Sequence, residues 1–223
     1  MNTAIHTPTR TSPVDRQLKT ISGNWREVYG MSALAAVSSV TGNEATAANP
    51  LAIADFSCLP QWGVKGSGAA DWLAQHNIPV PETSNTWCNH ANGGMVARLG
   101  MTEFAIQLGW DPPALPSFPL IQEGASAYPV ERQYLAIALR GAALPTLLRQ
   151  TCNVDFQALP ITTHPVVMTM MIGVSVTVLP GEQNGSPFYQ VWGDRSYGPY
   201  LWQTLVGIAE ELGGGVVGID QIR

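Results

Sequence analysis

Asp55 and Ser57 are the first residues of this sequence whose types and spacing suggest chemistry. An acid and a serine are two members of the arrangement that activates a hydroxyl nucleophile, but no nearby histidine is placed to act as the base. Asp and Ser directly before a turn also serve a second role, in which their side-chain oxygens accept hydrogen bonds from backbone N–H groups. The sequence favours this second role, and we predict that Asp55 and Ser57 are fold residues.

Potential metal ligands are few. Cys88 and His90 are separated by one residue, and His76 lies upstream. Zinc sites usually combine two ligand pairs, and a second pair is missing from this sequence. His164 lies beside an apolar strand-like run, where a histidine that is satisfied in the core or at an edge is expected rather than a base. We therefore predict no metal site.

The glycine-rich stretches do not predict a nucleotide site. Gly66-x-Gly68 follows a strand-like run, but the third glycine and the later ribose-binding acid of a dinucleotide fingerprint are missing. Residues 213–218 lie at the C-terminal end of a predicted helix, where no helix N-terminus faces a phosphate. Both stretches are interpreted as turns. The net charge of −5 and the absence of a Lys/Arg cluster also disfavour nucleic-acid binding.

The composition predicts a soluble, cytoplasmic protein with part of its surface covered by a partner. Apolar residues make up 45% of the chain, whereas charged residues make up only 12%, against ~25% in a typical soluble domain. Three widely spaced cysteines suit a reducing compartment, and the polar N-terminus does not resemble a secretory signal. The longest apolar run, residues 166–179, is too short to span a bilayer.

The elements that position these residues follow a repeated pattern. Val64-Lys65-Gly66 and Leu139-Arg140-Gly141 each follow a strand-like run and each precede a short helix with a leucine at the same offset. Glycine at such a turn supplies a conformation that a Cβ penalises. We therefore predict a single α+β domain over residues 25–223 with an internally duplicated, ferredoxin-like β-α-β pattern, with halves at about residues 50–110 and 130–223.

The remaining segments complete this outline. Residues 1–24 are expected to form a flexible N-terminal arm or a peripheral helix, and residues 26–40 have helical apolar spacing. The proline-rich stretch 111–129 is expected to be a surface linker. A last helix begins near Pro199 and is followed by an edge strand over residues 216–220. Around its start, Arg195, Tyr197, Tyr200 and Trp202 suit either a protein interface or packing of the helix on the sheet.

These landmarks resemble the folate-binding domain of the glycine-cleavage T-protein (aminomethyltransferase) family. In that family, an Asp and a Ser two residues later precede an apolar-x-Gly turn, and a Gly-rich strand leads into an Arg-Leu hairpin. Asp55, Ser57, Val64 and Gly66 match the first pattern, and the second is matched by Gly93, Gly94, Arg98, Leu99 and Phe104. The resemblance implies the T-protein folate-binding fold.

The second half is more similar to one branch, the γ subunits of heterotetrameric sarcosine oxidases. That branch has a Gly…Leu-Leu…Cys-x-x-Asp pattern, then Arg-Ser-aromatic and Tyr-Leu-Trp before the last helix. The matching residues are Gly141, Leu147, Leu148, Cys152, Asp155, Phe156, Arg195, Ser196, Tyr197, Tyr200, Leu201 and Trp202. The resemblance covers roughly residues 50–212.

Two departures bear on function. Folate-using members carry an acid in the Gly-rich strand, where this sequence has Met95, Val96, Ala97 and Arg98, and they carry a Thr-Gly-Glu segment, which is reduced here to Gly181-Glu182. A carboxylate is the natural partner for the donor groups of a pterin. The sequence therefore predicts no catalytic, cofactor-binding or metal residue on this chain.

The resemblance implies a non-catalytic accessory or assembly subunit of a sarcosine-oxidase-like, tetrahydrofolate-dependent amine-demethylating complex. The partners it implies are flavin-binding α- and β-type subunits and a small δ-type subunit, which hold FAD, FMN, NAD, zinc and tetrahydrofolate. One alternative is a stand-alone folate-binding, aminomethyltransferase-like protein with a relocated acid, for which the candidates are Asp55, Glu103, Asp155 and Glu182. Another alternative is a homo-oligomeric scaffold.

Overall fold

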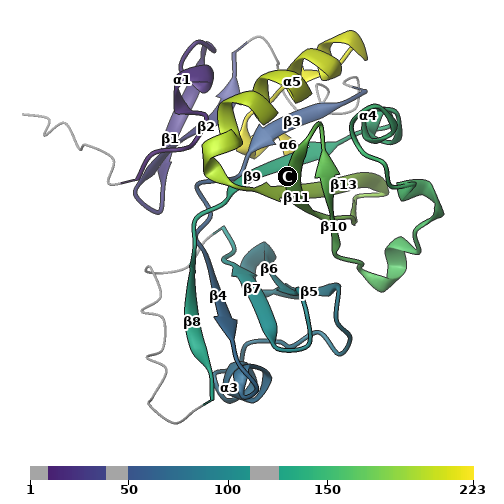
Figure 1. The fold of residues 1–223 in the computed structure, drawn as a ribbon. Coiled ribbons are helices and arrows are strands. Elements are labelled where there is room, and N and C mark those ends of the chain that lie inside the picture. The colour runs from purple at the N-terminus through teal and green to yellow at the C-terminus, as the bar shows by residue number, and fades with distance from the viewer. Residues whose placement is uncertain (1–9, 39–49, 111–125) are drawn as a thin grey trace, which may run out of the picture.

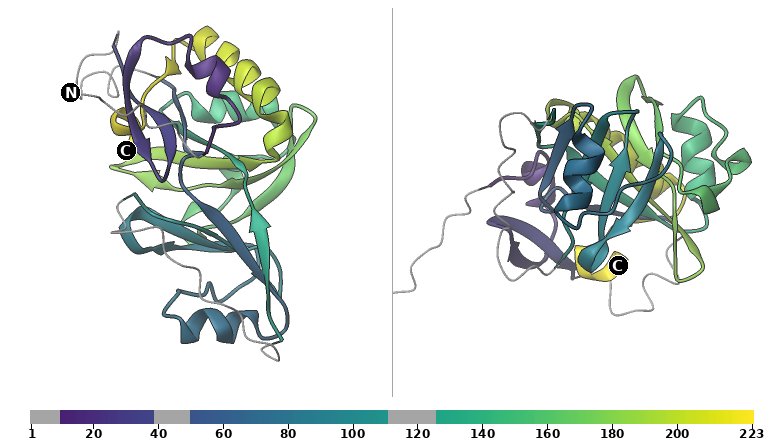
Figure 2. Two further views of the ribbon diagram at one scale, coloured as in Figure 1. Left: turned by 90° about the vertical axis from the view of Figure 1, so that its left-hand side faces the viewer. Right: turned by 90° about the horizontal axis from the view of Figure 1, so that it is seen from below.

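Two β-sheets are stacked at the centre of the molecule, and helices cover the outer face of each (Figures 1 and 2). The structure is a computed structural model that describes residues 10–38, 50–110 and 126–223. It is a mixed α+β arrangement in a single domain. From top to bottom in Figure 1, a helical layer, the larger sheet, the smaller sheet and a second helical layer follow each other.

The larger sheet has seven strands in the order β10-β11-β13-β9-β3-β14, with β12 beside β13. All neighbouring strands are antiparallel except β14, which runs parallel to β3. The strand bounds are β3 (Ala52–Asp55), β9 (Leu135–Arg140), β10 (Val167–Met171), β11 (Val174–Leu179), β12 (Glu182–Gln183), β13 (Ser186–Gly193) and β14 (Gly215–Val216). Helices α4 (Leu144–Thr151) and α5 (Gly198–Glu211) cover its outer face.

The smaller sheet has five antiparallel strands in the order β5-β6-β7-β4-β8. Its strands are β4 (Gln61–Lys65), β5 (Thr86–His90), β6 (Gly94–Arg98), β7 (Glu103–Gln107) and β8 (Tyr128–Arg132), and helix α3 (Ala69–Gln75) covers its outer face. The order matches β10-β11-β13-β9-β3 of the larger sheet position by position. Because β3 pairs with β9 and β8 pairs with β4, each half of the chain lends its first strand to the sheet of the other half.

Alternating side chains divide the core into layers. On β9, Leu135, Ile137 and Leu139 join the cluster beneath the helices, whereas Ala136 and Ala138 point toward the smaller sheet. Alanines from both sheets meet in this inter-sheet layer: Ala52, Ala54, Ala97, Ala105, Ala136 and Ala138. Small side chains allow the sheets to approach closely. A third cluster joins α3 to the smaller sheet through two tryptophans, Trp62 and Trp72, whose rings meet edge to face at 6.0 Å.

The N-terminal segment differs from the sequence prediction in two respects. Residues 10–24, which were expected to be part of a flexible arm, are packed on the domain. Helix α1 (Asp15–Leu18) buries Val14 and Leu18 in the main core, with 0% and 2% of their surface exposed. The helix predicted over residues 26–40 is not formed over its described part, residues 26–38, since β1 (Gly23–Val28) and β2 (Met31–Val37) pair as a hairpin. Tyr29 and Gly30 both have positive φ, which is the geometry of a tight two-residue hairpin turn.

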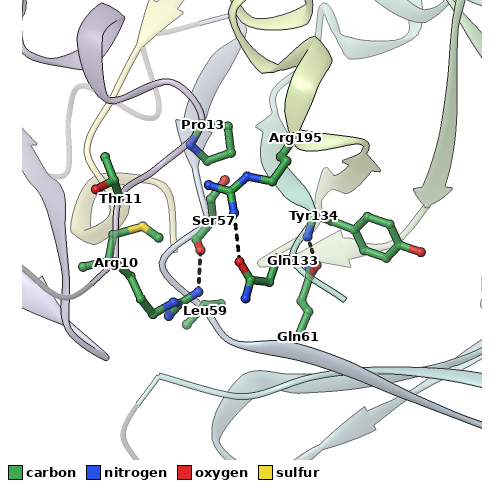
Figure 3. Close-up of a pocket in the computed structure, with 10 residues that line it drawn as sticks. Arg10, Thr11, Pro13, Ser57, Leu59, Gln61, Gln133, Tyr134 and Arg195 are labelled. Atoms are coloured by element: carbon green, nitrogen blue, oxygen red, sulfur yellow. Dashed lines mark hydrogen bonds between the residues drawn. The ribbon is translucent and has the colours of Figure 1, made fainter. Parts of the chain in front are cut away.

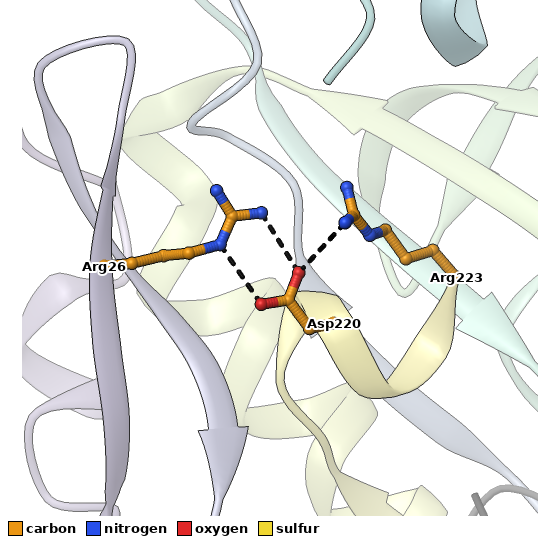
Figure 4. A network of polar contacts seen from close by, with 3 residues as sticks. All are labelled: Arg26, Asp220 and Arg223. Atoms are coloured by element: carbon orange, nitrogen blue, oxygen red, sulfur yellow. Dashed lines mark hydrogen bonds and ion pairs between the residues drawn. The ribbon is translucent and has the colours of Figure 1, made fainter. Parts of the chain in front are cut away.

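The C-terminal segment is fastened to this hairpin. Helix α6 (Ile219–Ile222), which the sequence did not predict, presents Asp220 to Arg26 of β1 and to Arg223 (Figure 4). The Arg26 guanidinium donates two hydrogen bonds to the Asp220 carboxylate, at 3.1 and 3.0 Å. The predicted last helix is present as α5. The edge strand predicted over residues 216–220 is not formed over that range, since β14 ends at Val216 and residues 219–222 form α6.

Other predictions are met in part. The strand-like run before Gly66 consists of two strands, β3 and β4, which lie in different sheets. The chain after Cys152 contains the 3₁₀ turn η2 (Phe156–Ala158). The other short 3₁₀ turns are η1 (Ala91–Gly93), η3 (Ile161–Thr163) and η4 (Arg195–Tyr197). Residues 111–125 of the predicted linker lie outside the described residues. Within the described chain, no helix is long and apolar enough to cross a bilayer.

Candidate functional site

Asp55 is a buried junction between three distant segments. Its carboxylate accepts a hydrogen bond from Ser12 Oγ at 2.6 Å and another from the Ser57 backbone N–H at 3.0 Å. Ser57 Oγ in turn accepts from the backbone N–H of Ala136 at 3.1 Å. Burial raises the pKa of Asp55, although these hydrogen bonds oppose the shift. The contacts tie the N-terminal segment, the β3–β4 loop and β9 together.

A cavity of about 290 Å³ lies beside this junction (Figure 3). It is formed by the N-terminal segment, the β3–β4 loop, the corner between β8 and β9, and η4. The residues that line it are Arg10, Thr11, Pro13, Met31, Ser57, Leu59, Gln61, Gln133, Tyr134 and Arg195. None of these is an acid, and two are arginines. The cavity is therefore positively charged along its lining.

Both arginines are held by neutral oxygens. Arg10 donates to the backbone carbonyls of Ser57, Cys58 and Tyr29, at 3.3, 3.1 and 3.4 Å. Arg195 donates to Gln133 Oε1 at 2.8 Å. Burial lowers the pKa of Arg10, and the positive charge of Arg195 lowers it further. The two guanidinium groups are thus close enough to repel each other.

Neutral side chains complete the arrangement. Gln61 Oε1 accepts a hydrogen bond from the Tyr134 backbone N–H at 3.3 Å, which holds the corner before β9. The Tyr134 hydroxyl accepts a hydrogen bond from Arg132, whose guanidinium lies over the Tyr134 ring. These contacts fix the walls of the cavity on the side of the smaller sheet.

The other residues that match the T-protein pattern in the sequence hold backbone segments in place. Arg98 donates hydrogen bonds to four carbonyls, those of Pro81, Glu82, Gly100 and Met101. Gly94 begins β6 where an added Cβ would lie 2.7 Å from the Gln107 carbonyl oxygen. Gly66 and Gly141 have φ of +125° and +135°, in the region that favours glycine. None of these four residues lines the two-arginine cavity.

The histidines and cysteines do not converge. Within residues 10–38, 50–110 and 126–223, no group of three or more potential metal ligands is present. His76 Nδ1 lies 2.7 Å from the Trp72 carbonyl oxygen, and His164 stacks on Trp87 with ring centroids 4.4 Å apart. Burial raises the pKa of Cys88 and lowers that of His90.

The four residues predicted as a possible interface separate into three environments. Tyr197 and Tyr200 are half exposed, at 52% and 50%, and the Tyr200 hydroxyl donates to the Ile172 carbonyl at 3.0 Å. Trp202 is 3% exposed and belongs to the main core, so the packing alternative applies to it. Arg195 lines the cavity. Tyr200 and Trp202 lie in different environments because residues two apart on a helix point in different directions.

The four acids proposed for a relocated folate contact are engaged elsewhere or exposed. Glu103 pairs with Lys65 at 2.9 Å and with Arg132. Asp155 caps η2 by accepting from the Gln157 N–H at 3.1 Å, and Glu182 lies exposed on β12. None of these three acids lines the cavity, and neither does the buried Asp55.

Arg10, Gln133 and Tyr134 escaped the sequence reasoning. Arg10 lies in a segment rich in polar residues that was expected to be peripheral, and its partners are about 20 to 50 positions away. The cavity forms where segments that are distant in the chain come together, and the spacing of neighbouring residues in the sequence does not predict such tertiary contacts.

Comparison with solved structures identifies the fold class. The chain has the fold of a glycine cleavage system aminomethyltransferase T from Bartonella henselae, with a TM-score of 0.69, 12% identity and 95% of this chain covered. It spans 60% of the length of that protein.

A second similar structure is a chain of the heterotetrameric sarcosine oxidase from Corynebacterium sp. U-96, solved in complex with pyrrole 2-carboxylate. Here the TM-score is 0.62 and the identity 16%, and the match covers 92% of this chain and 97% of that chain. The fold expected from the sequence is thereby confirmed. No protein-family model and no curated protein matches the sequence.

Proposed function

We propose that this chain is a non-catalytic accessory subunit of a cytoplasmic, sarcosine-oxidase-like complex that demethylates an amine with tetrahydrofolate as the acceptor of the one-carbon unit. Its partners are a flavin-binding α-type, a flavin-binding β-type and a small δ-type subunit. FAD, FMN, NAD, zinc and tetrahydrofolate belong to those partners.

The observation that carries the proposal is the packing of β6. Folate-using members of the T-protein family carry an acid on the corresponding strand, whereas Met95 and Ala97 of this strand are 7% and 0% exposed. Both side chains belong to the apolar inter-sheet layer, beside Trp192 and Phe188. Their surroundings are those of a core, which disfavours a charged pterin contact there. The match in length to a chain of a heterotetrameric sarcosine oxidase adds support.

Exposed apolar side chains supply surface for assembly. On β10, the edge strand of the larger sheet, Met168 and Met170 are 55% and 48% exposed. Tyr197 and Tyr200 add aromatic surface near the start of α5. Aromatic residues and methionine are enriched at the centres of protein interfaces. These four side chains are the surface that we assign to contact with partner subunits.

We also propose that the two halves arose as copies of one β-α-β unit. The matching strand orders of the two sheets support this, as do the equivalent glycine turns at Gly66 and Gly141. A scaffold duplicated in this way retains its shape without an active site, which suits an assembly role.

The test is co-purification. The tagged chain is expressed in its native host and recovered by affinity, and the native mass and the absorbance spectrum of the eluate are recorded. A yellow complex of four different polypeptides is expected. A colourless monomer or homo-oligomer would overturn the proposal.

Paired variants locate the surface. Tyr197→Ser combined with Tyr200→Ser is expected to reduce the recovery of partner subunits without changing the unfolding temperature of the free chain. Tyr128→Ser, which removes another exposed tyrosine on β8, is the matched control. Equal loss of partners in both variants would remove this surface from the proposal.

A further inference from the structure

We propose that the cavity between Arg10 and Arg195 is a binding site for a small molecule that carries an oxyanion group, a carboxylate or a phosphate. The proposal goes beyond the accessory role above and does not depend on it. It concerns a site that the free chain presents by itself.

The charge of the cavity is the first argument. Two guanidinium groups line it, and within the described chain neither forms an ion pair with a carboxylate. Their hydrogen bonds go to backbone carbonyls and to one amide oxygen. Cations in proteins normally lie near an opposite charge, and bringing two of them together in a partly buried place costs free energy. An anion bound between them would remove that cost.

None of the nearby acids lines the cavity. Asp55 lies behind Ser57 with its carboxylate held by Ser12 and Ser57, and burial raises its pKa. The carboxylate of Asp194 accepts from the backbone N–H and the Oγ of Ser196, at 2.8 and 2.6 Å. Glu131 is exposed, with Gln133 Nε2 donating to it at 3.3 Å. The Ser196 hydrogen bonds lower the pKa of Asp194 and the charge of Arg195 adds to this lowering, so Asp194 offsets part of the Arg195 charge from outside the cavity lining.

The shape and the donors of the cavity define the ligand class. A guanidinium presents a planar fork of N–H donors that matches a carboxylate or a phosphate. Thr11 and Gln61 add a hydroxyl and an amide to the lining, whereas Leu59, Met31 and Pro13 add apolar surface. At about 290 Å³, the cavity is at the small end of ligand sites. A small organic acid or phosphate fits this combination better than a large cofactor does.

The position of the site gives binding a consequence. Arg10 comes from the N-terminal segment and Arg195 from η4 before α5, so an anion between them joins two segments that lie 185 positions apart in the chain. A ligand that binds only the folded chain stabilises it in proportion to the logarithm of its concentration. We therefore expect phosphate or acetate to raise the unfolding temperature as well as to bind.

The experiment is a titration of the free, full-length chain. Inorganic phosphate and acetate are added separately up to tens of millimolar, with sodium chloride as the reference at equal ionic strength. Binding is followed through the NMR signals of the arginine Nε–Hε groups of ¹⁵N-labelled protein. Saturable shifts of the Arg10 and Arg195 signals are expected with at least one probe. The stronger probe then distinguishes a phosphate site from a carboxylate site.

Matched variants make the result specific. Arg195→Gln is expected to weaken binding about tenfold or more, because one charge-assisted hydrogen-bonding group is lost. Arg149→Gln, which alters an exposed arginine on α4, is expected to leave binding unchanged. Arg195→Lys, which retains the charge but not the fork, should lie between wild type and Arg195→Gln. Absence of saturable shifts with both probes, or equal binding by wild type and Arg195→Gln, would overturn the proposal.

Discussion

The two strand-to-helix turns of this protein have the same backbone and different surroundings. At Gly66, a hypothetical Cβ would lie 2.1 Å from the Ser126 carbonyl oxygen, and at Gly141 it would lie 2.3 Å from that of Pro50. Two residues on, Gly68 and Ala143 donate their backbone N–H groups to these same oxygens, at 3.0 and 2.9 Å. The close approach of a strand from the other half requires glycine at both turns.

The side chains beside the turns have diverged. Lys65, directly before Gly66, pairs with Glu103, which also pairs with Arg132. Arg140, directly before Gly141, donates instead to the Ile222 carbonyl at 3.1 Å. Helix α3 packs on a small separate cluster, whereas α4 shares the main core with α5 and α1. Backbone geometry therefore constrains these turns more strongly than side-chain chemistry does.

Alanine at either glycine is the most severe test of this equivalence. Gly66→Ala and Gly141→Ala are each expected to lower the free energy of unfolding by about 3 kcal/mol or more, because a strained φ is combined with a backbone clash. Urea denaturation of both variants measures the loss. A cost below about 1 kcal/mol at one turn only would show that the two turns are not equivalent.

Removing a charge from the smaller sheet is expected to have a smaller effect on the free energy of unfolding. Arg132 has a side chain that is only 8% exposed, so Glu103→Gln leaves a buried guanidinium without its acid. We expect a loss of about 2 kcal/mol in the free energy of unfolding, which is less than for a fully buried pair because Glu103 is 27% exposed. Arg140 forms no such pair with any residue that the structure describes, and Arg140→Gln should cost less.

A surface ion pair serves as the control for Glu103→Gln. Arg26 and Asp220 are 34% and 38% exposed, and Asp220→Asn is expected to cost at most about 1 kcal/mol. Both variants are measured by urea denaturation at low salt and at high salt. Equal losses in the two variants would contradict the importance that we assign to the burial of Arg132.

Asp55 and Glu131 extend the comparison to the strands that are exchanged between the halves. Asp55 pairs with Ile137, four residues before Gly141, and Glu131 pairs with Trp62, four residues before Gly66. Asp55 is buried, whereas Glu131 is exposed. Equivalent positions therefore hold one acid in the core and one in solvent.

The buried acid is expected to affect stability as a function of pH. Burial raises the folded-state pKa of Asp55, so the folded state binds its proton more tightly than the unfolded state does. The contribution of Asp55 to the free energy of unfolding is therefore largest below about pH 4, the unfolded pKa. It falls as pH rises from there through the folded pKa. Asp55→Asn should remove this component from stability curves measured by denaturation across the acidic range. Glu131→Gln is the exposed control, and an identical change in both variants would refute the expectation.

Sequence reasoning succeeded where a local rule decides the structure. The glycine turns and the helix after Pro199 each follow from nearby residues. It failed over residues 26–38, where apolar spacing suggested a helix but the turn at Tyr29 and Gly30 produces a hairpin. It also missed Arg10, because the carbonyl groups that hold this arginine are brought to it only by the tertiary fold.

Gly207→Ala is expected to change the free energy of unfolding least, and in the opposite direction from the other variants. It lies within α5, and an added Cβ there would meet no atom within 4 Å. Gly207→Ala is therefore expected to raise the free energy of unfolding by about 0.5–1 kcal/mol, because alanine loses less backbone freedom on folding than glycine does. The variant is measured by urea denaturation beside Gly66→Ala and Gly141→Ala. If Gly207→Ala also destabilised the protein by several kcal/mol, the added methyl group itself, rather than the geometry of the two turns, would explain all three results. A gain in stability at Gly207 and a loss at both turns would instead assign the requirement for glycine to the contact between the halves.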